Sequence, residues 1–257
     1  MTPLNILYQD EYLVAVHKPS GLLVHRSALA RGETEFLLQR LRDQLGQRVY
    51  PVHRLDRPTS GVMVLALSSE VAARLSDSFG ERQVDKRYLA VVRGVAPAEA
   101  RLDYPLREED GIRPKADMLA MPSMTDIRCV DSVELPVQVD RYPKARYSLV
   151  EAKPLTGRRH QIRRHLSRRG YPVIGDAKHG KSVHNRFFAE QLGAPRLLLA
   201  ASYLAFDHPL DNKRLELSCA LDDTMTALFH HLGWAGHLPL DSVRTPPIAT
   251  PPALQAL

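Results

Sequence analysis

Short apolar segments recur along the chain, and polar or turn-forming residues separate them. The segment 62–67 is apolar at every position, which is typical of a strand buried on both faces. The other segments are short and rich in Val, Leu, Ile and Tyr, the residues that strands favour. The pattern predicts strands at 6–8, 13–16, 62–67, 88–92, 146–152, 197–206 and 215–217.

Helical periodicity is confined to a few segments. Leucines spaced one turn apart, followed by a glycine that can end a helix, predict a helix that stops before Gly46. Asp222 is a good N-cap for another helix, and a strongly basic helix is expected to stop at Gly170. The predicted helices cover 33–45, 69–79, 157–169 and 222–232.

Two stretches lack periodicity. The stretch 107–124 is polar and interrupted by glycine and proline, which predicts a long surface excursion, and the Pro-rich residues 239–257 predict a disordered tail. Strands outnumber helices elsewhere, without regular strand–helix alternation. Residues 1–238 therefore predict a single α+β domain, built on a mixed, mostly antiparallel sheet with flanking helices.

Composition excludes several classes of protein. A hydrophobic fraction of 44% with 25% charged residues is ordinary for a globular chain. No apolar run reaches the roughly 20 residues that span a bilayer, and the first residues lack the basic start of a signal peptide. Cys129 and Cys219 are too few for a disulfide framework. We therefore expect a reduced, cytoplasmic protein without a membrane partner.

The positive charge is concentrated in one part of the chain. Residues 141–196 contain 14 Lys and Arg against 3 Asp and Glu, although the whole chain is only +6. The remainder is therefore net acidic. One basic segment on an acidic background favours a face that binds a polyanion, although a solvated surface without a partner explains the composition almost as well.

The densest group of chemically useful residues is HRLDRPTSG, at residues 53–61. It leads into the buried segment 62–67, and it places Asp56 between Arg54 and Arg57. Neighbouring cations favour an ionised carboxylate, and an ionised, positioned Asp can act as a nucleophile or a general base. From spacing alone, a purely structural Asp remains the simpler explanation.

The same nine residues resemble a signature of the RluA-type pseudouridine synthases, in which this Asp is catalytic. Three further motifs resemble that family in order and spacing: HKPSG at 17–21, KRY at 86–88 and TGRRHQIR at 156–163. His17 stands where the family usually has Asn, and Ala200 where relatives often have His. The resemblance implies the family's fold, with a central catalytic cleft in the sheet.

The resemblance also implies roles for individual residues. Asp56 would act on the substrate, Tyr88 would stack on the uracil, and Arg163 would pair with Asp56. Arg54 would enter the base stack as the target uridine flips out. Breaking the N1–C1′ bond and rejoining the base through C5 needs neither oxidation nor hydrolysis, so no cofactor or metal is expected. Whether Asp56 attacks the sugar or removes a sugar proton stays open.

Other residues are expected to bind the RNA or shape the pocket. A helix over 157–169 would place Arg159 and Arg163 on one face. An aliphatic lining is expected from Leu198 and Leu199, for which core packing is an equal explanation. Besides Arg54, the residues expected to contact RNA are Arg57, Arg158, Arg159, Arg164, Arg168 and Lys178.

The resemblance favours a tRNA substrate, with uridine 65 as the target, and no obligate protein partner is implied. Ribosomal RNA remains the alternative, because both substrates would use the same residues. A catalytically silent RNA-binding module is a weaker alternative, which an intact set of Asp56, Tyr88 and Arg163 disfavours.

A rival of another class is a P-loop NTPase acting on RNA. GDAKHGKS, at residues 175–182, fits the G-x-x-x-x-G-K-[ST] pattern. A P-loop follows a buried parallel strand, however, and only two apolar residues precede this motif. The context therefore disfavours nucleotide binding.

Overall fold

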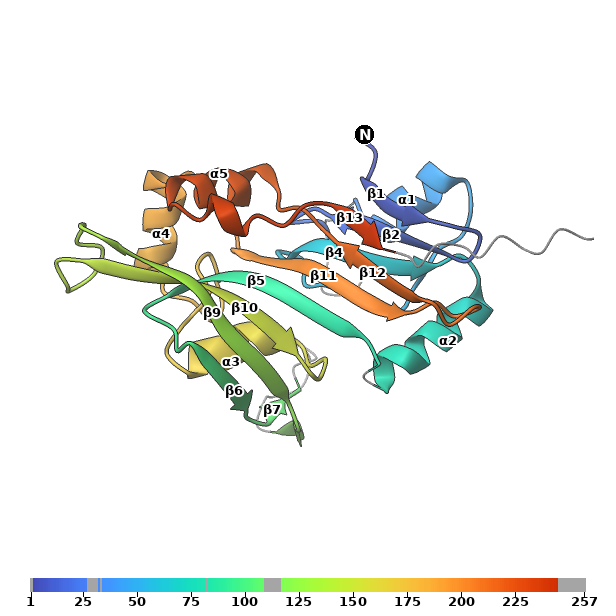
Figure 1. Cartoon of the computed structure of the whole chain (residues 1–257), viewed down its shortest axis with the longest axis horizontal. Helices are drawn as coiled ribbons and strands as arrows, with labels where there is room; N and C mark the ends of the chain where they lie inside the picture. Colours follow the sequence, from blue (N-terminus) through green and yellow to red (C-terminus); the bar gives the residue numbers. More distant parts are fainter. Residues whose placement is uncertain (1, 27–31, 33, 82, 109–116, 245–257) are drawn as a thin grey trace, which may run out of the picture.

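The computed structural model describes residues 2–26, 32, 34–81, 83–108 and 117–244. In this part of the chain, eleven strands form one sheet, whose main path runs β1-β2-β4-β11-β5-β10-β9-β6 (Figure 1). Neighbouring strands pair antiparallel, except β4 with β11, which run parallel. The prediction of a mixed, mostly antiparallel sheet is confirmed.

The strands along the main path are long in the centre and short at the edges. In path order they are β1 (Ile6–Gln9), β2 (Leu13–Lys18), β4 (Ser60–Ala66), β11 (Leu199–Asp207), β5 (Asp85–Arg93), β10 (Ala145–Pro154), β9 (Met124–Leu135) and β6 (Glu99–Asp103). Beside this path, β3 (Tyr50–Pro51) pairs with β4, β12 (Arg214–Ser218) with β11, and β13 (Ser242–Arg244) with β12. A separate hairpin joins β7 (Leu106–Arg107) to β8 (Ala120–Met121).

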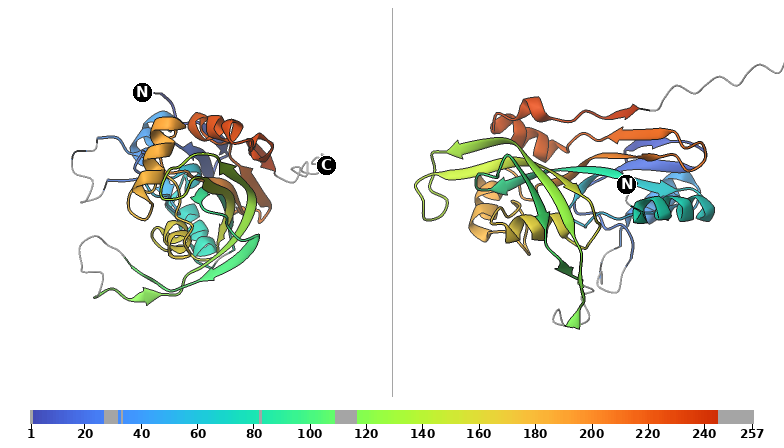
Figure 2. Two further views of the ribbon diagram at one scale, coloured as in Figure 1. Left: turned by 90° about the vertical axis from the view of Figure 1, so that its left-hand side faces the viewer. Right: turned by 60° about the horizontal axis from the view of Figure 1, so that its bottom comes forward.

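Helices cover both faces of the sheet. Alternate residues of β5 show the division: Leu89 and Val91 pack in a cluster with α4 (Ser182–Gln191) and α5 (Asp223–His231). Ala90 and Val92 pack on the other face, in a cluster with α3 (Gln161–Arg168). In Figure 2 the end of the sheet formed by β6 and β9 curls around the side on which α3 lies.

The third cluster lies at the other end of the sheet, around β4. All seven residues of β4 are buried, as the continuous apolar pattern of 62–67 predicted. Two helices pack there, α1 (Leu37–Leu45) and α2 (Ser69–Gly80), through buried residues one turn apart. Gly46 ends α1 with a φ of 67°, and Asp222 caps α5 by accepting a hydrogen bond from the amide of Met225 at 3.0 Å. Both helix-end predictions are confirmed.

Several predicted elements differ from the structure. The basic helix begins at Gln161, because His160 adopts a left-handed conformation, so residues 157–160 are not helical and Arg159 shares no helix face with Arg163. The first helix begins at Leu37 rather than at residue 33.

Strands β3, β6, β7, β8, β9 and β13, and helix α4, were not predicted. The expected excursion at 107–124 is bordered by β7 and contains β8, and its residues 109–116 lie outside the described part of the chain. The expectation of a tail without structure from residue 239 fails at β13, an edge strand; residues 245–257 lie outside the described part.

Candidate active site

Asp56 lies in the loop between β3 and β4, and hydrogen bonds fasten this loop to the one that follows β2. The amide of Thr59 donates to the carbonyl of Asp56 at 3.1 Å, which closes a turn. The amide of Gly21 donates to the carbonyl of Arg57 at 2.9 Å, and the hydroxyl of Ser20 donates to the carbonyl of Pro58 at 2.8 Å. The backbone is therefore fixed at Asp56 and at the two residues that follow it.

Lys18 is buried and forms hydrogen bonds to both loops. Its ammonium group donates to the carbonyls of Pro19, Leu22 and Arg57 at 2.9, 2.8 and 3.0 Å. Burial, with the charge of nearby Arg196, lowers the pKa of Lys18 to about 7. Three carbonyl acceptors match the three donors of an ammonium group. Lys18 belongs to the HKPSG motif at 17–21, from which no role for it was predicted.

The backbones of β4 and β11 approach each other closely where the Asp56 loop enters β4, and this brings the end of the loop near Tyr88 of β5. Ala201 of β11 pairs with Gly61 on one side and with Tyr88 on the other, so the three residues lie in a row across β4, β11 and β5. Gly61 has a φ of 114°, and a Cβ there would lie 2.1 Å from the carbonyl oxygen of Ala201. Only glycine satisfies both conditions, which explains the glycine that ends the motif.

Arg163, in the first turn of α3, joins two carboxylates. Its Nη1 donates to Asp56 Oδ2 at 3.0 Å, while its Nε and Nη2 donate to the two oxygens of Asp176 at 2.7 and 2.8 Å. The Asp176 side chain is 0% exposed, that of Arg163 6% and that of Asp56 20%. The arginine is thus anchored in the interior and presents one donor to a carboxylate at the surface.

Asp176 is the partner that sequence reasoning missed as a site residue. It also accepts hydrogen bonds from the amides of Lys178 and His179, both at 2.9 Å. Burial alone would raise the pKa of Asp176, but these bonds and those from Arg163 hold it below its usual value. The group is a permanent anion that fixes the arginine. The glycine before it, at 175, is the first residue of the motif tested above as a P-loop.

His160 is a second neighbour of Asp56 that the sequence did not single out. Its φ is 54°, and its Nε2 lies 3.9 Å from Asp56 Oδ2. Its Nδ1 lies 3.1 Å from Nε2 of His179. Burial lowers the pKa of His160 to about 4. The ring is therefore neutral at physiological pH. It lies against the Asp56 carboxylate without neutralising its charge.

Tyr88 lies on the face of the sheet that α3 covers, and its ring packs in a cluster with Ile162 and Leu199. Burial and the negative charge of Asp56 raise the pKa of the Tyr88 phenol. The phenol is therefore neutral at physiological pH. Arg163 contacts Asp56, and Tyr88 packs in one cluster with Ile162 of the helix that carries Arg163.

The two leucines expected to line a pocket lie on opposite faces of the sheet. Leu199 shares the cluster of Tyr88, whereas Leu198 packs in the cluster of α4 and α5. Both side chains are buried: Leu198 is 0% exposed and Leu199 3%. Only Leu199 therefore lies on the side of the candidate site.

The predicted RNA-binding residues are divided by exposure. Arg164 is buried, and its Nη1 donates to the carbonyl of Arg107 at 2.9 Å. Arg158 is partly buried, and its Nε lies 3.4 Å from the carbonyl of Pro122. The exposed members of the set are Arg54, Arg57, Arg159, Arg168 and Lys178.

The motif at 175–182 does not form a phosphate cradle. In a P-loop the backbone amides point at the phosphates, but here the amides of residues 178 and 179 donate to the carboxylate of Asp176. Val173, two residues before the motif, forms only an isolated antiparallel bridge to Val92, not a buried parallel strand. Nucleotide binding by this motif is therefore not supported.

The described residues contain neither a metal-binding cluster nor a membrane-spanning helix. No group of three or more His, Cys, Asp and Glu side chains within them is placed to hold a metal ion. No helix among them combines the length and apolar character needed to cross a membrane.

Comparison with known proteins bears on the whole arrangement. The sequence profile described as RNA pseudouridylate synthase matches residues 12–168, a span that contains Asp56, Tyr88 and Arg163. The chain belongs to this family. As a pseudouridine synthase it is an RNA-modifying isomerase. Asp176 lies beyond the matched span.

Relatives of this pseudouridine synthase match over nearly their whole length. The tRNA pseudouridine synthase C of Vibrio cholerae is 48% identical over 235 residues, which cover 90% of this chain and 96% of that protein. The tRNA pseudouridine synthase C of Yersinia pestis is 48% identical over 248 residues, covering 95% and 96%. That of Salmonella typhi is 48% identical over 240 residues, covering 92% of each.

Solved structures share the fold. Human RNA Pseudouridylate Synthase Domain Containing 4 aligns with a TM-score of 0.68 at 28% identity, covering 93% of this chain and 95% of that one. Human RNA Pseudouridylate Synthase Domain Containing 1 aligns with a TM-score of 0.66 at 27% identity, covering 95% and 92%.

Proposed function

We propose that this pseudouridine synthase modifies tRNA, in the cytoplasm, and that its target is uridine 65. Support for tRNA comes from the relatives named tRNA pseudouridine synthase C, which are 48% identical over nearly the full length of both chains. Position 65 follows from the resemblance of the motifs to that group. Ribosomal RNA is the competing substrate.

The proposed reaction depends on Asp56. The observation that carries it is the asymmetry around Arg163, which Asp176 anchors in the interior while Asp56 stays 20% exposed. The carboxylate is thereby held in place by a fixed cation and remains accessible to a flipped nucleoside. It can attack the sugar at C1′ or remove a sugar proton, and both routes need the anion.

The isomerisation conserves all atoms of the nucleoside except for one exchanged proton. The N1–C1′ bond breaks, the uracil turns, and a C5–C1′ bond forms. The hydrogen at C5 is then lost to water, and N1 gains a proton. The ring of Tyr88 would stack on the uracil during the rotation, and its phenol would relay the C5 proton by accepting it while giving its own hydrogen to water.

The exposed arginines and lysine have roles before the chemistry. Arg54, two residues before Asp56, would enter the space that the uridine vacates. Arg57, Arg159, Arg168 and Lys178 would contact phosphates around the cleft. Such contacts release counterions, so RNA affinity should fall steeply as salt increases.

The test measures tritium released from tRNA labelled at uracil C5, with labelled ribosomal RNA fragments in parallel. Release from tRNA at one position is expected, since forming the C5–C1′ bond must expel that hydrogen. Release from ribosomal RNA alone would overturn the tRNA assignment. Mapping the product at a site other than 65 would overturn that position only.

The matched variant is Asp56→Asn, which keeps the shape of the side chain and an acceptor for Arg163. It should abolish tritium release while leaving RNA affinity within about threefold, because the carboxylate acts in the chemical step. A variant that still turns over would exclude Asp56 as the catalytic residue.

A further inference from the structure

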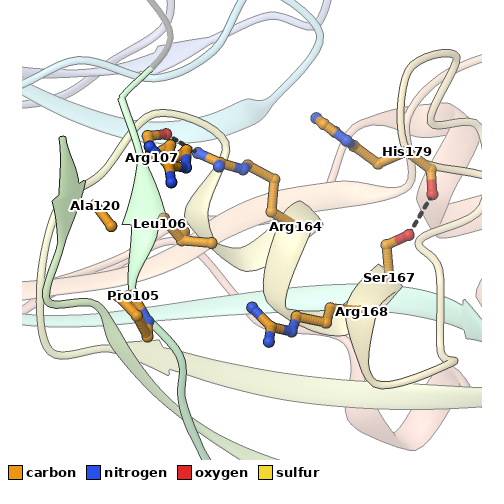
Figure 3. A pocket seen from close by; sticks show the side chains of 8 residues that line it. All are labelled: Pro105, Leu106, Arg107, Ala120, Arg164, Ser167, Arg168 and His179. Carbon is orange, nitrogen blue, oxygen red and sulfur yellow. Dashed lines mark hydrogen bonds between the residues drawn. The ribbon is translucent and has the colours of Figure 1, made fainter. Parts of the chain in front are cut away.

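Arg196 ends the basic segment 141–196, but its side chain is not part of the basic surface. Arg168 of the same segment lines a pocket beside α3 (Figure 3). The side chain of Arg196, by contrast, is only 10% exposed. Burial lowers the pKa of Arg196 to about 10, so the guanidinium still carries its charge at physiological pH. A buried charge of this kind requires partners inside the protein.

The guanidinium of Arg196 joins segments that are far apart in the sequence. Its Nη2 donates to the hydroxyl of Ser60, the first residue of β4, at 2.9 Å, and to the carbonyl of Leu199, the first residue of β11, at 3.3 Å. Its Nε donates to the carbonyl of Leu197 at 2.9 Å, and its Nη1 forms an ion pair with Asp222, the N-cap of α5. One side chain therefore connects the start of β4 to the start of β11 and to α5.

The pairing between β4 and β11 is short. It consists of Ser60 with Ala200 and Gly61 with Ala201. The neighbouring pairs of strands, β2 with β4 and β11 with β5, each extend over six residue pairs. Parallel pairing is also slightly less stable per residue than antiparallel pairing. The relative position of β4 and β11 therefore depends on side chains that bridge them, and Arg196 is such a bridge.

The candidate active site spans this short pairing. Asp56 lies in the loop that enters β4, four residues before Ser60. Tyr88 lies on β5, where it pairs with Ala201 of β11, and it packs in one cluster with Leu199. A shift of β4 along β11 would therefore move the Asp56 carboxylate relative to the Tyr88 ring.

The backbone at Arg196 also supports the loop that carries Asp176. A Cβ on Gly175, the residue before Asp176, would collide with the carbonyl oxygen of Arg196, so the two backbones are in contact. Asp176 in turn anchors Arg163 through two hydrogen bonds. Arg196 therefore contacts this loop through its backbone and the end of the Asp56 loop through its side chain.

We propose that Arg196 is a positioning residue for the pseudouridine synthase reaction, which fixes β4 against β11 and thereby sets the position of the Asp56 carboxylate relative to Tyr88. This inference rests on the proposed function, because it takes Asp56 as the reacting carboxylate. Arg196 acts through the backbones of the two strands and not through contact with the substrate. Its loss should therefore slow the chemical step and leave RNA affinity unchanged, because small displacements of a reacting group lower the rate steeply.

The first test removes one acceptor of Arg196 and leaves the arginine in place. Ser60→Ala deletes the hydroxyl at the start of β4, and Ser148→Ala is the matched control, since both serines are 0% exposed. The Ser148 hydroxyl donates to the carbonyl of Gly94 at 2.8 Å and accepts from the amide of Ala96 at 2.9 Å, both just after β5. The control therefore loses at least as much buried hydrogen bonding without touching the pairing of β4 with β11.

Single-turnover tritium release and RNA affinity are measured separately, on the RNA that the wild type modifies and at a temperature where circular dichroism shows each variant to be folded. Ser60→Ala should lower the single-turnover rate about tenfold with RNA affinity within about twofold of the wild type, as expected for a small displacement of the reacting group. Ser148→Ala should keep the wild-type rate. Equal rates in the two variants, or a loss of affinity that matches the loss of rate, would overturn the positioning role.

The second test replaces the arginine itself. Arg196→Lys keeps a positive charge beside Asp222, but an ammonium group lacks the planar fork of donors that reaches Ser60 and Leu199 together. It should lower the single-turnover rate by about tenfold or more, and adding Ser60→Ala should cause little further loss, because both changes remove the same contact. Fully additive losses would refute the bridge.

Failure of the positioning role and failure of the proposed function give different results. Release by the wild type together with an unchanged rate in Ser60→Ala would refute the positioning role alone. Absence of release from tRNA by the wild type, or turnover by Asp56→Asn, would refute the proposed function.

Discussion

Replacing Asp176 with asparagine tests whether the buried end of the Arg163 bridge holds the active site together. The substitution keeps the size of the side chain but removes a charge that accepts two hydrogen bonds from Arg163 and two from backbone amides. Because Asp176 is 0% exposed and Arg163 6%, little water is available to solvate the arginine afterwards. Breaking a buried ion pair from one side costs about 3–5 kcal/mol.

The chain contains a matched control with the same geometry at the surface. Arg101 donates to both oxygens of Asp126, at 2.7 and 2.8 Å, but the side chains are 60% and 35% exposed. An exposed pair contributes only about 0.2–1 kcal/mol. Asp126→Asn should therefore lower the free energy of unfolding by a small fraction of the loss caused by Asp176→Asn.

Thermal unfolding and tritium release measure the two consequences. For a chain of this size, 1 kcal/mol corresponds to a Tm change of roughly 2–4 °C, so Asp176→Asn should lower the Tm by roughly 6–20 °C. Tritium release at a temperature where the variant is folded should fall by up to about 100-fold, because Asp56 loses its fixed partner. A Tm change equal to that of Asp126→Asn, with normal activity, would refute the anchoring role.

Three other substitutions have defined outcomes. Gly61→Ala should prevent folding or lower the Tm severely, since the new Cβ would lie 2.1 Å from the carbonyl oxygen of Ala201. The control Gly80→Ala should be neutral, because no atom lies within 4 Å of its new Cβ. Similar Tm values for the two variants would contradict the close approach of β4 and β11. Burial lowers the pKa of His53 to about 3, so its contribution to stability is complete above pH 6.5 and is lost as pH falls from 6.5 toward 3. His53→Asn should reduce the decline of unfolding free energy between pH 6.5 and 5, measured with denaturant, by about 1.4 kcal/mol per pH unit; an unchanged decline would exclude this linkage. Tyr88→Phe should keep RNA affinity, because the ring remains, while slowing tritium release; wild-type release would show that the phenol takes no part in proton transfer.

The parts of the fold that the sequence predicts are those whose burial is one-sided or complete. The continuous apolar run that became β4 and the leucine spacing of α1 left no reasonable alternative. By contrast, β9 is only partly buried, and its alternation at Thr125, Ile127 and Cys129 is masked by charged neighbours. Helix α4 buries just His184 and Phe188, one turn apart. Weak amphipathicity of this kind becomes visible only when a packed neighbour is known.

The candidate site was predictable only as far as local motifs extend. The motifs named Asp56 and Arg163, although 107 positions separate them along the chain. Asp176 was assigned no role, because its role depends on a hydrogen bond to Arg163, 13 positions away, rather than on its sequence neighbours. His160 was assigned to a helix, and its left-handed backbone, which directs the ring toward Asp56, has no local signature.

The fastening of the two loops around Asp56 determines which molecule must deform during recognition. Lys18 and Ser20 hold the carbonyls of residues 57 and 58, so the protein meets its substrate with the Asp56 carboxylate already in position. The conformational change then falls on the nucleic acid, which must unstack a base to fit a template that does not adapt. Uridines in weakly paired or bulged helices would cost the least energy to unstack. The deformability of the RNA therefore helps to determine where the modification is made.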